Sequence, residues 1–242
     1  MGFFVAISFL TILPLRGKVD PQALGRSIAY FPAVGLLLGL ILVGLDRLFI
    51  KLLPRVAVDA LLLIALVVLT GALHLDGFID SCDALFSAES PEARLDRLKD
   101  PRVGAFGAVG AFCLLLLKYA ALSSLAPSVK LWALLIALAL GRFGIVYAIF
   151  FYPYREGPGM GRAFKEHSGA FEFLMAAATT FIVSFIAFKR VGLFVMVVGW
   201  LVAEALARFA LKKLPGLTGD IYGAIDEAVE AFVLLLLASL GG

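Results

Sequence analysis

Three aspartates stand in one short polar segment, at a spacing that could hold a divalent cation. Asp76, Asp80 and Asp83 follow one another at intervals of four and three residues, which places their side chains on one face of a helix. Like charges held together repel, so a positive partner is expected among them. Carboxylate oxygens joined by substrate phosphate oxygens suit Mg²⁺. The segment therefore predicts a magnesium site, with an ordinary solvated helix end as the alternative.

Cationic residues continue the same polar segment. Arg97, Lys99 and Arg102 supply positive charge, and Asp100 lies among them. Carboxylates for a metal and guanidinium groups for phosphate are the components of a phosphoryl-transfer site. Gly104 then opens an apolar run, where a glycine either leaves backbone N–H groups free for an anion or lets helices approach closely. We expect this stretch to bind substrate.

Two later segments add polar groups. Arg155 begins a glycine-rich stretch that could cradle phosphates or could be a plain connection. Asp220, Glu227 and Glu230 share a helical face that leads into the last apolar run. An ionisable residue inside a membrane boundary is a functional hypothesis by default. These acids are therefore candidates for catalysis.

The elements that carry these residues must lie in lipid. Of the 242 residues, 62% are hydrophobic and 16% are charged, and the mean hydropathy is +1.02, far outside the soluble balance. No alternating segments indicate a transmembrane barrel, so an all-α, polytopic helical bundle is expected. About seven spans are predicted, at roughly 28–50, 56–75, 104–126, 131–151, 170–188, 191–210 and 221–240.

The chain is expected to form one membrane-embedded catalytic domain over residues 1–242. Lys and Arg are about twice as frequent on the side that receives the loops at about 76–103, 152–169 and 211–220, which by the positive-inside rule places these loops in the cytoplasm. The active site would then face the cytoplasm from the cell membrane. Residues 3–13 are too short to span and predict an interfacial or re-entrant segment.

Several motifs resemble the cobalamin synthase, or adenosylcobinamide-GDP ribazoletransferase, family. The pattern His-Leu-Asp-Gly-x-x-Asp-x-x-Asp begins at His74, Lys-Asp-x-Arg-x-Gly-x-x-Gly begins at Lys99, and Thr-Gly-Asp-x-x-Gly-Ala-x-x-Glu-x-x-Glu begins at Thr218. Two positions depart from the family pattern, because Ala84 replaces a frequent glycine and Ile12 replaces a frequent arginine. Neither departure removes a proposed metal ligand.

The resemblance implies the last step of cobamide assembly. The 5′ oxygen of α-ribazole, or of its 5′-phosphate, would attack the corrinoid-side phosphorus of adenosylcobinamide-GDP, and GMP would leave. Mg²⁺ held by Asp76, Asp80 and Asp83 would neutralise the diphosphate. Asp220, Glu227 or Glu230 would bind a second metal or act as general base, and which of them does so stays open. His74, which begins the first motif, joins the substrate-binding candidates.

Two other functions compete with this interpretation. An ion-coupled secondary transporter would also carry intramembrane acids, but no repeated halves are visible. A phosphotransferase acting on CDP-linked alcohols would have Ala-Arg where Asp80-Ser81 stands. The expected partners are the two small-molecule substrates and the lipid bilayer, with no nucleic acid; a homo-oligomer or an association with other cobamide-assembly enzymes is possible.

Overall fold

The chain folds almost entirely into helices. The computed structural model describes residues 2–14, 20–87, 90–155 and 160–241. Its elements are α1 (Gly2–Leu10), α2 (Pro21–Ser27), the short 3-10 helix η1 (Ile28–Tyr30), α3 (Phe31–Phe49), α4 (Arg55–Leu69), α5 (Leu73–Phe86), α6 (Pro91–Arg97), α7 (Ala105–Ser124), α8 (Pro127–Phe151), α9 (Met160–His167), α10 (Ala170–Leu211) and α11 (Gly219–Gly241). The predicted all-α fold is confirmed.

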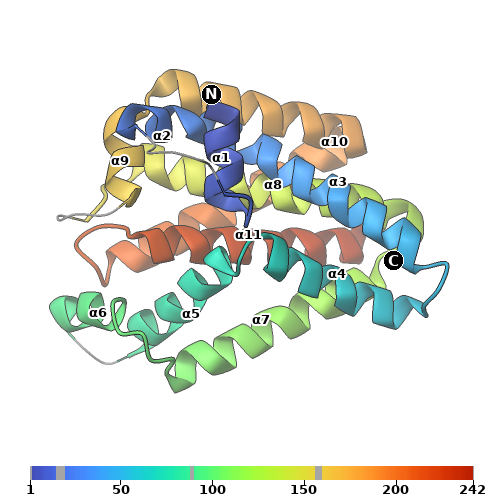
Figure 1. Ribbon diagram of the computed structural model, residues 1–242, viewed down its shortest axis with the longest axis horizontal. Coiled ribbons are helices and arrows are strands. Elements are labelled where there is room, and N and C mark those ends of the chain that lie inside the picture. Colours follow the sequence, from blue (N-terminus) through green and yellow to red (C-terminus); the bar gives the residue numbers. More distant parts are fainter. Residues whose placement is uncertain (1, 15–19, 88–89, 156–159, 242) are drawn as a thin grey trace.

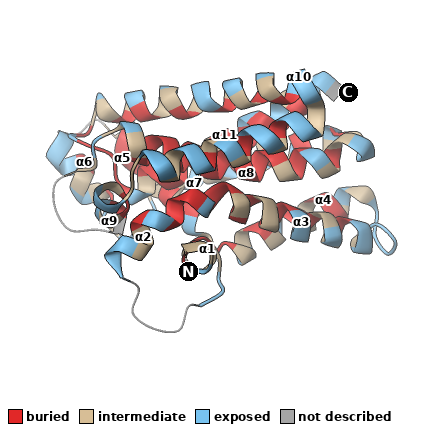
Figure 2. Cartoon of the chain, turned by 90° about the horizontal axis from the view of Figure 1, so that it is seen from above, coloured by how far each residue is buried: buried red, intermediate tan, exposed pale blue. Residues whose placement is uncertain are grey.

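Helices α8 and α11 form the centre of the bundle (Figures 1 and 2). Residues 136–149 of α8 are all buried, as expected for a helix that is apolar on every face. Helix α8 packs against α3, α10 and α11, and α11 also packs against α5 and α7. The two central helices thus connect the lipid-facing outer helices to the polar segments.

Helix α10 contains two arms rather than one long rod. The helical geometry breaks at Phe188 and at Lys189, whose φ is 52°, a value that non-glycine residues seldom adopt. Beyond the break the backbone of Gly192 meets the carbonyl of Ser184, so the chain folds back on itself. This hairpin accounts for the two spans predicted at 170–188 and 191–210.

The number of membrane spans depends on how broken helices are counted. Four described helices are long and apolar enough to cross a membrane, or five when α4 and α5 are taken as one bent pair. The α10 hairpin is one of the four, and α11 carries three buried acids, which lower its apolar character. The multi-pass membrane character is confirmed, whereas the count of seven stays a prediction.

The span predicted at 56–75 ends earlier than expected. Gly71 and Ala72 both take left-handed backbone angles, with φ of 59° and 58°, and α5 leaves at 90° to α4. The acidic segment after residue 72 is the helix α5, which agrees with the helical face predicted for its aspartates. We take the membrane-spanning part of this pair to end at Leu69, because α5 carries three aspartates.

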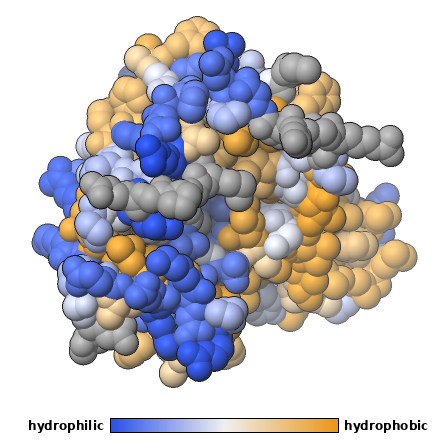
Figure 3. All heavy atoms as spheres, turned by 60° about the vertical axis from the view of Figure 1, so that its left-hand side comes forward, coloured by the Kyte–Doolittle hydropathy of each residue, from blue (hydrophilic) through white to orange (hydrophobic). Residues whose placement is uncertain are grey.

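One end of the bundle is polar. Helices α5, α6 and α9 lie at the same end of the molecule (Figure 1), and hydrophilic side chains gather there while apolar side chains cover much of the rest (Figure 3). Helix α1 packs inward, with Ala6 and Leu10 fully buried. The loops predicted at about 76–103, 152–169 and 211–220 all fall at this end, although residues 88–89 and 156–159 within them lie outside the described part.

Candidate active site

A close crossing of α5 and α11 brings the first acidic groups together. A Cβ atom on Gly77 would lie 2.8 Å from the carbonyl oxygen of Asp220, and one on Gly223 would lie 2.9 Å from that of His74. Only glycine at both positions lets the two backbones approach this closely. The last helix therefore packs beside the first acidic motif.

The crossing produces a cluster of three aspartates with a net negative charge. Asp76, Asp80 and Asp220 lie near enough for their charges to interact: burial followed by the charges of Asp76, Asp220 and Asp83 raises the pKa of Asp80 to about 6. Burial also raises the pKa of Asp220, although a hydrogen bond from Thr218 opposes the rise. None of these three carboxylates forms an ion pair with another described residue. We call Asp76, Asp80 and Asp220 the surface acid cluster.

Asp83 has a different partner from the one predicted. Its carboxylate accepts hydrogen bonds from the backbone N–H groups of Gly104, at 2.6 Å, and Gly107, at 2.9 Å. Both N–H groups belong to the amino-terminal turn of α7, where backbone N–H groups have no acceptor within the helix. Asp83 therefore caps α7, and the structure does not place the carboxylates of Asp76, Asp80 and Asp83 around one point. Of the two roles considered for Gly104, a free N–H group for an anion is not observed, because the residue donates its N–H group to Asp83.

The cationic stretch between α6 and α7 pairs largely with itself. Arg102 donates to both carboxylate oxygens of Asp100, at 2.9 and 2.7 Å, and this pairing lowers the pKa of Asp100 to about 2. Lys99 lies 3.1 Å from Asp96, on the exposed surface. Arg97 lies 3.8 Å from Asp100 and next to the Asp83 cap. These residues are at the polar end but do not line the cavity, described below, that Asp76 and Asp220 border.

The remaining predicted acids lie inside the bundle with two cations. Lys118 of α7 pairs with Glu227 and, at 2.6 Å, with Glu230; Arg142 of α8 pairs with Glu230 and, at 2.8 Å, with Asp226. All five side chains are buried. We call them the buried charge cluster. Glu227 and Glu230 therefore neutralise two intramembrane cations and do not reach the cavity that the surface acids border.

His74 lies between the two clusters. Its Nδ1 atom is 2.9 Å from a carboxylate oxygen of Asp226, while its ring also borders the cavity. Sequence reasoning did not include Asp226 among the site residues, although it precedes Glu227 directly. Lys118 and Arg142 were likewise not assigned a role. The sequence feature that could have predicted these pairs is the presence of two cations within apolar spans, because a buried cation needs a buried anion as its partner.

Backbone pairing positions Arg155 beside the surface acid cluster. The N–H group of Arg155 donates to the carbonyl of Leu217 at 3.0 Å, and that of Leu217 donates to the carbonyl of Pro153 at 2.9 Å. This short pairing joins the segment after α8 to the segment before α11. The positive charge of Arg155 consequently acts on Asp220, and its role in binding substrate stays a prediction.

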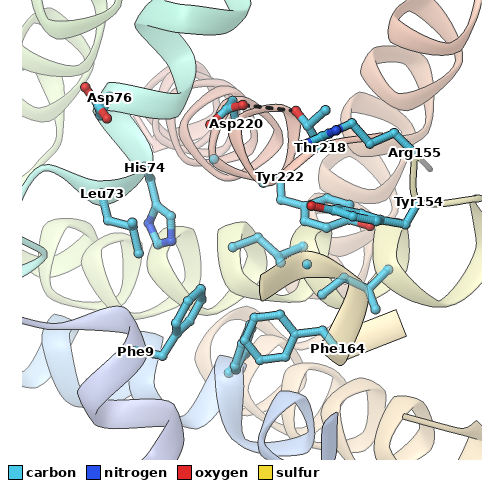
Figure 4. Close-up of a pocket in the computed structure, with 16 residues that line it drawn as sticks. Phe9, Leu73, His74, Asp76, Tyr154, Arg155, Phe164, Thr218, Asp220 and Tyr222 are labelled. Atoms are coloured by element: carbon cyan, nitrogen blue, oxygen red, sulfur yellow. Dashed lines mark hydrogen bonds between the residues drawn. The ribbon is translucent and has the colours of Figure 1, made fainter. Parts of the chain in front are cut away.

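A cavity of about 270 Å³ opens beside the surface acid cluster. At one end lie Asp76, Asp220 and Arg155, with Thr218 between Asp220 and Arg155 (Figure 4). At the other end lie apolar side chains, including Phe9 and Phe164 (Figure 4). Helices α1, α3, α5, α8, α9 and α11 all contribute to the wall. The arrangement can bind a molecule with one apolar part and one polar or phosphorylated part.

These features define a multi-pass membrane protein with an acid-rimmed cavity at its polar end. The chain belongs to the cobalamin-5-phosphate synthase family, whose profile matches residues 2–238. An adenosylcobinamide-GDP ribazoletransferase of Desulforamulus reducens is 38% identical over 96% of this chain and 94% of its own length. Proteins of the same name from Geotalea daltonii and Pseudomonas savastanoi are 37% and 36% identical, each over 99% of this chain and 98% and 100% of their own lengths. No solved structure matches the chain. The family predicted from the motifs is confirmed.

Proposed function

We propose that the protein joins adenosylcobinamide-GDP to α-ribazole, or to α-ribazole 5′-phosphate, and releases GMP. The 5′ oxygen of the ribose forms a bond to the corrinoid-side phosphorus, and the bond from that phosphorus to the oxygen of GMP breaks. The proton of the 5′ hydroxyl leaves to a base or to solvent. The observation that carries the proposal is the family match over nearly the whole chain, which includes every helix that borders the cavity.

The surface acid cluster fits Mg²⁺ better than the buried charge cluster does. Asp226, Glu227 and Glu230 have ligand atoms within 4.8 Å of one another, but Lys118 and Arg142 already pair with them and offset two of their three charges. A metal there would have to displace a buried cation. Asp76, Asp80 and Asp220 lack such a partner among the described residues, and their repulsion favours a bound cation. When bound, Mg²⁺ would offset the charge of the diphosphate.

The chain's own side chains supply the remaining parts of the site. Arg155 lies beside Asp220 at the polar end of the cavity, where its guanidinium can hold a phosphate. The aromatic end excludes water from the reacting groups, which strengthens each electrostatic interaction within the cavity. The work of such a site is positioning and charge neutralisation.

We further propose that the polar end faces the cytoplasm, since Lys and Arg concentrate there. Glu92 on α6 is exposed at this end, so a cysteine in its place should react with an impermeant thiol reagent only after cells are opened. A cysteine at Leu52, exposed between α3 and α4, is the matched site at the other end and should react in intact cells. The reverse pattern would overturn this orientation.

Incubation of the purified protein with adenosylcobinamide-GDP, α-ribazole and Mg²⁺ tests the reaction. We expect GMP and adenosylcobalamin to form in equal amounts, and chelation of the metal to stop their formation. Phe112→Ala is a matched control, because this side chain is 68% exposed on α7 and far from the cavity lining. Absence of GMP from a folded preparation would refute the proposed function.

A further inference from the structure

We infer that Glu204 of α10 is a positioning residue, which acts through the hydroxyl of Tyr152 to place Arg155 for phosphate binding. The inference rests on the proposed function, which gives Arg155 a phosphate to hold. It goes beyond that function, because α10 contributes none of the described residues that line the cavity. Glu204 would thus affect the binding of a substrate that it does not touch.

Glu204 is the centre of a polar network between α8 and α10. Its carboxylate accepts hydrogen bonds from the hydroxyls of Tyr147, at 2.6 Å, and of Tyr152, and it pairs with Arg208 at 2.5 Å. The side chain of Glu204 is only 14% exposed. A carboxylate in a membrane-spanning helix is costly unless it has partners, and hydrogen bonds to a charged acceptor are stronger than those between neutral groups. The network therefore fastens the end of α8 to α10.

Tyr152 is the residue at which the chain leaves α8. Its backbone N–H group donates to the carbonyl of Ala148 at 3.1 Å, and its φ and ψ of −113° and 150° are extended. Pro153 follows, and a proline fixes its own φ and restricts the residue before it to extended angles. Arg155 lies three residues on, about 10 Å along an extended chain. The hydroxyl that Glu204 holds therefore sets the direction in which this short, stiff segment leaves the helix.

The other end of the segment is held by α11. The backbone pairing described above joins Pro153 and Arg155 to Leu217. A Cβ atom on Gly216 would lie 2.6 Å from the backbone nitrogen of Arg155, so the two strands of chain approach closely only because a glycine is present. The charge of Arg155 then acts on Asp220, beside the polar end of the cavity (Figure 4).

Two anchors consequently determine where the guanidinium of Arg155 lies. Leu217 fixes the segment relative to α11 through two backbone hydrogen bonds, and Glu204 fixes its exit from α8 through Tyr152. Without the second anchor, the segment can tilt about the backbone pairing, and the guanidinium is no longer held towards a phosphate beside Asp220. Because binding depends on such alignment, loss of the remote contact should weaken the binding of a phosphorylated substrate.

A matched pair of tyrosine variants tests this inference. Tyr152→Phe and Tyr147→Phe each remove one hydroxyl from the same carboxylate, but only Tyr152 adjoins the segment that carries Arg155. In equilibrium dialysis with Mg²⁺, Arg155→Ala should raise the Kd for adenosylcobinamide-GDP at least about tenfold, and Tyr152→Phe should raise it about threefold to tenfold. Tyr147→Phe should lower the unfolding midpoint but leave this Kd unchanged. The Kd for α-ribazole, which carries no phosphate, should be the same in every variant.

A double-mutant cycle shows whether Tyr152 acts through Arg155. In the Arg155→Ala background, the further change Tyr152→Phe should leave the Kd for adenosylcobinamide-GDP unchanged, because the side chain that it positions is gone. Glu204→Gln, which keeps the shape but removes the charge, should behave in the same way. The cycle does not depend on the folding of Glu204→Gln, since Tyr152→Phe removes a single oxygen atom at a half-buried position. Effects of Tyr152→Phe and Arg155→Ala that add fully would overturn the inference.

The remaining outcomes separate this inference from the proposed function. Equal rises in the Kd for adenosylcobinamide-GDP in Tyr147→Phe and Tyr152→Phe would show that the network only supports the fold, and would overturn the inference even if the parent releases GMP. An unchanged Kd in Arg155→Ala would overturn it as well. Coupling of Tyr152 to Arg155 in a parent that binds adenosylcobinamide-GDP but releases no GMP with α-ribazole would support the inference and refute the proposed reaction instead.

Discussion

Helix α11 carries two groups of acids that have opposite surroundings. Near its start, Asp220 meets Asp76 and Asp80 of α5 with no cation paired to them in the described residues. About two turns later, Asp226, Glu227 and Glu230 meet Lys118 and Arg142 inside the bundle. The first group is a net negative charge beside a cavity. The second is close to neutral and lies among packed helices.

The difference shows that the role of an acidic residue follows from the groups that surround it rather than from its spacing along the sequence. A buried carboxylate is tolerated only when it is paired, so the inner acids stabilise the cations of α7 and α8. The outer acids repel one another, and this repulsion is relieved when a cation binds. We therefore expect substitutions in the inner group to act mainly on stability and those in the outer group to act mainly on turnover.

The largest effect on stability is expected from Lys118→Met. The change leaves Glu227 without its cation and Glu230 with Arg142 alone, and breaking a buried pair costs about 3–5 kcal/mol. Thermal unfolding of the purified protein in detergent should show a large fall in the midpoint or a failure to accumulate folded protein. Lys212→Met, at an exposed position, is the control and should unfold like the parent. Equal midpoints for both variants would show that the inner cluster is not structural.

The largest effect on turnover is expected from Asp80→Asn. Removing this charge weakens the cation site, and GMP release should fall at least about a thousandfold, or about 4 kcal/mol of transition-state stabilisation. The folded state should be retained, because Asp80 makes no ion pair in the described structure. An Asp80→Asn variant that turns over at the parent's rate would remove the surface acid cluster from the mechanism.

A smaller effect on stability separates Asp83 from its neighbours. Asp83→Ala leaves the N–H groups of Gly104 and Gly107 without their acceptor, which should cost about 1–3 kcal/mol. Asp83→Asn retains one carbonyl oxygen and should lose less. The unfolding midpoints should therefore fall in the order parent, Asp83→Asn, Asp83→Ala. If Asp83→Ala kept the parent's midpoint but bound no metal, Asp83 would be a ligand rather than a cap.

The sequence predicted the acids and their helical face but not their partners. Spacing along one helix is local, so the common face of Asp76 and Asp80 was accessible from the pattern. The cap formed by Asp83 joins residues 21 and 24 positions apart, and the pairs of Lys118 join residues more than 100 positions apart. Such contacts follow from how whole helices pack, which one sequence does not specify.

The aromatic end of the cavity was also not predicted. Phe9, Phe31 and Phe164 are scattered among 21 phenylalanines in an apolar chain, and only the packing of α1, α3 and α9 brings them together. Their residue type did not indicate that they line a cavity, because most aromatic residues in such a chain face lipid or neighbouring helices. The break at residues 71 and 72 was missed for a similar reason, since an apolar run continues through it.

The smallest expected effect is a pH dependence in the absence of divalent cations. The folded state raises the pKa of Asp80 from 3.8 to about 6, so it binds a proton more tightly than the unfolded state does. Stability should therefore decrease as pH rises from about 4 to about 6 and then level off. The unfolding midpoint of the parent, compared with that of Asp80→Asn, isolates this contribution. A difference between the two that does not change with pH would contradict the assigned environment.

The most direct test of the account measures where the divalent cation binds. Mn²⁺ is a paramagnetic substitute for Mg²⁺, and its binding to the purified protein can be followed by electron paramagnetic resonance. We predict that the parent binds Mn²⁺, that Asp76→Asn, Asp80→Asn and Asp220→Asn each lose this binding, and that Glu227→Gln retains it. Binding that survives in all three aspartate variants but disappears in Glu227→Gln would place the cation in the inner cluster and contradict the account.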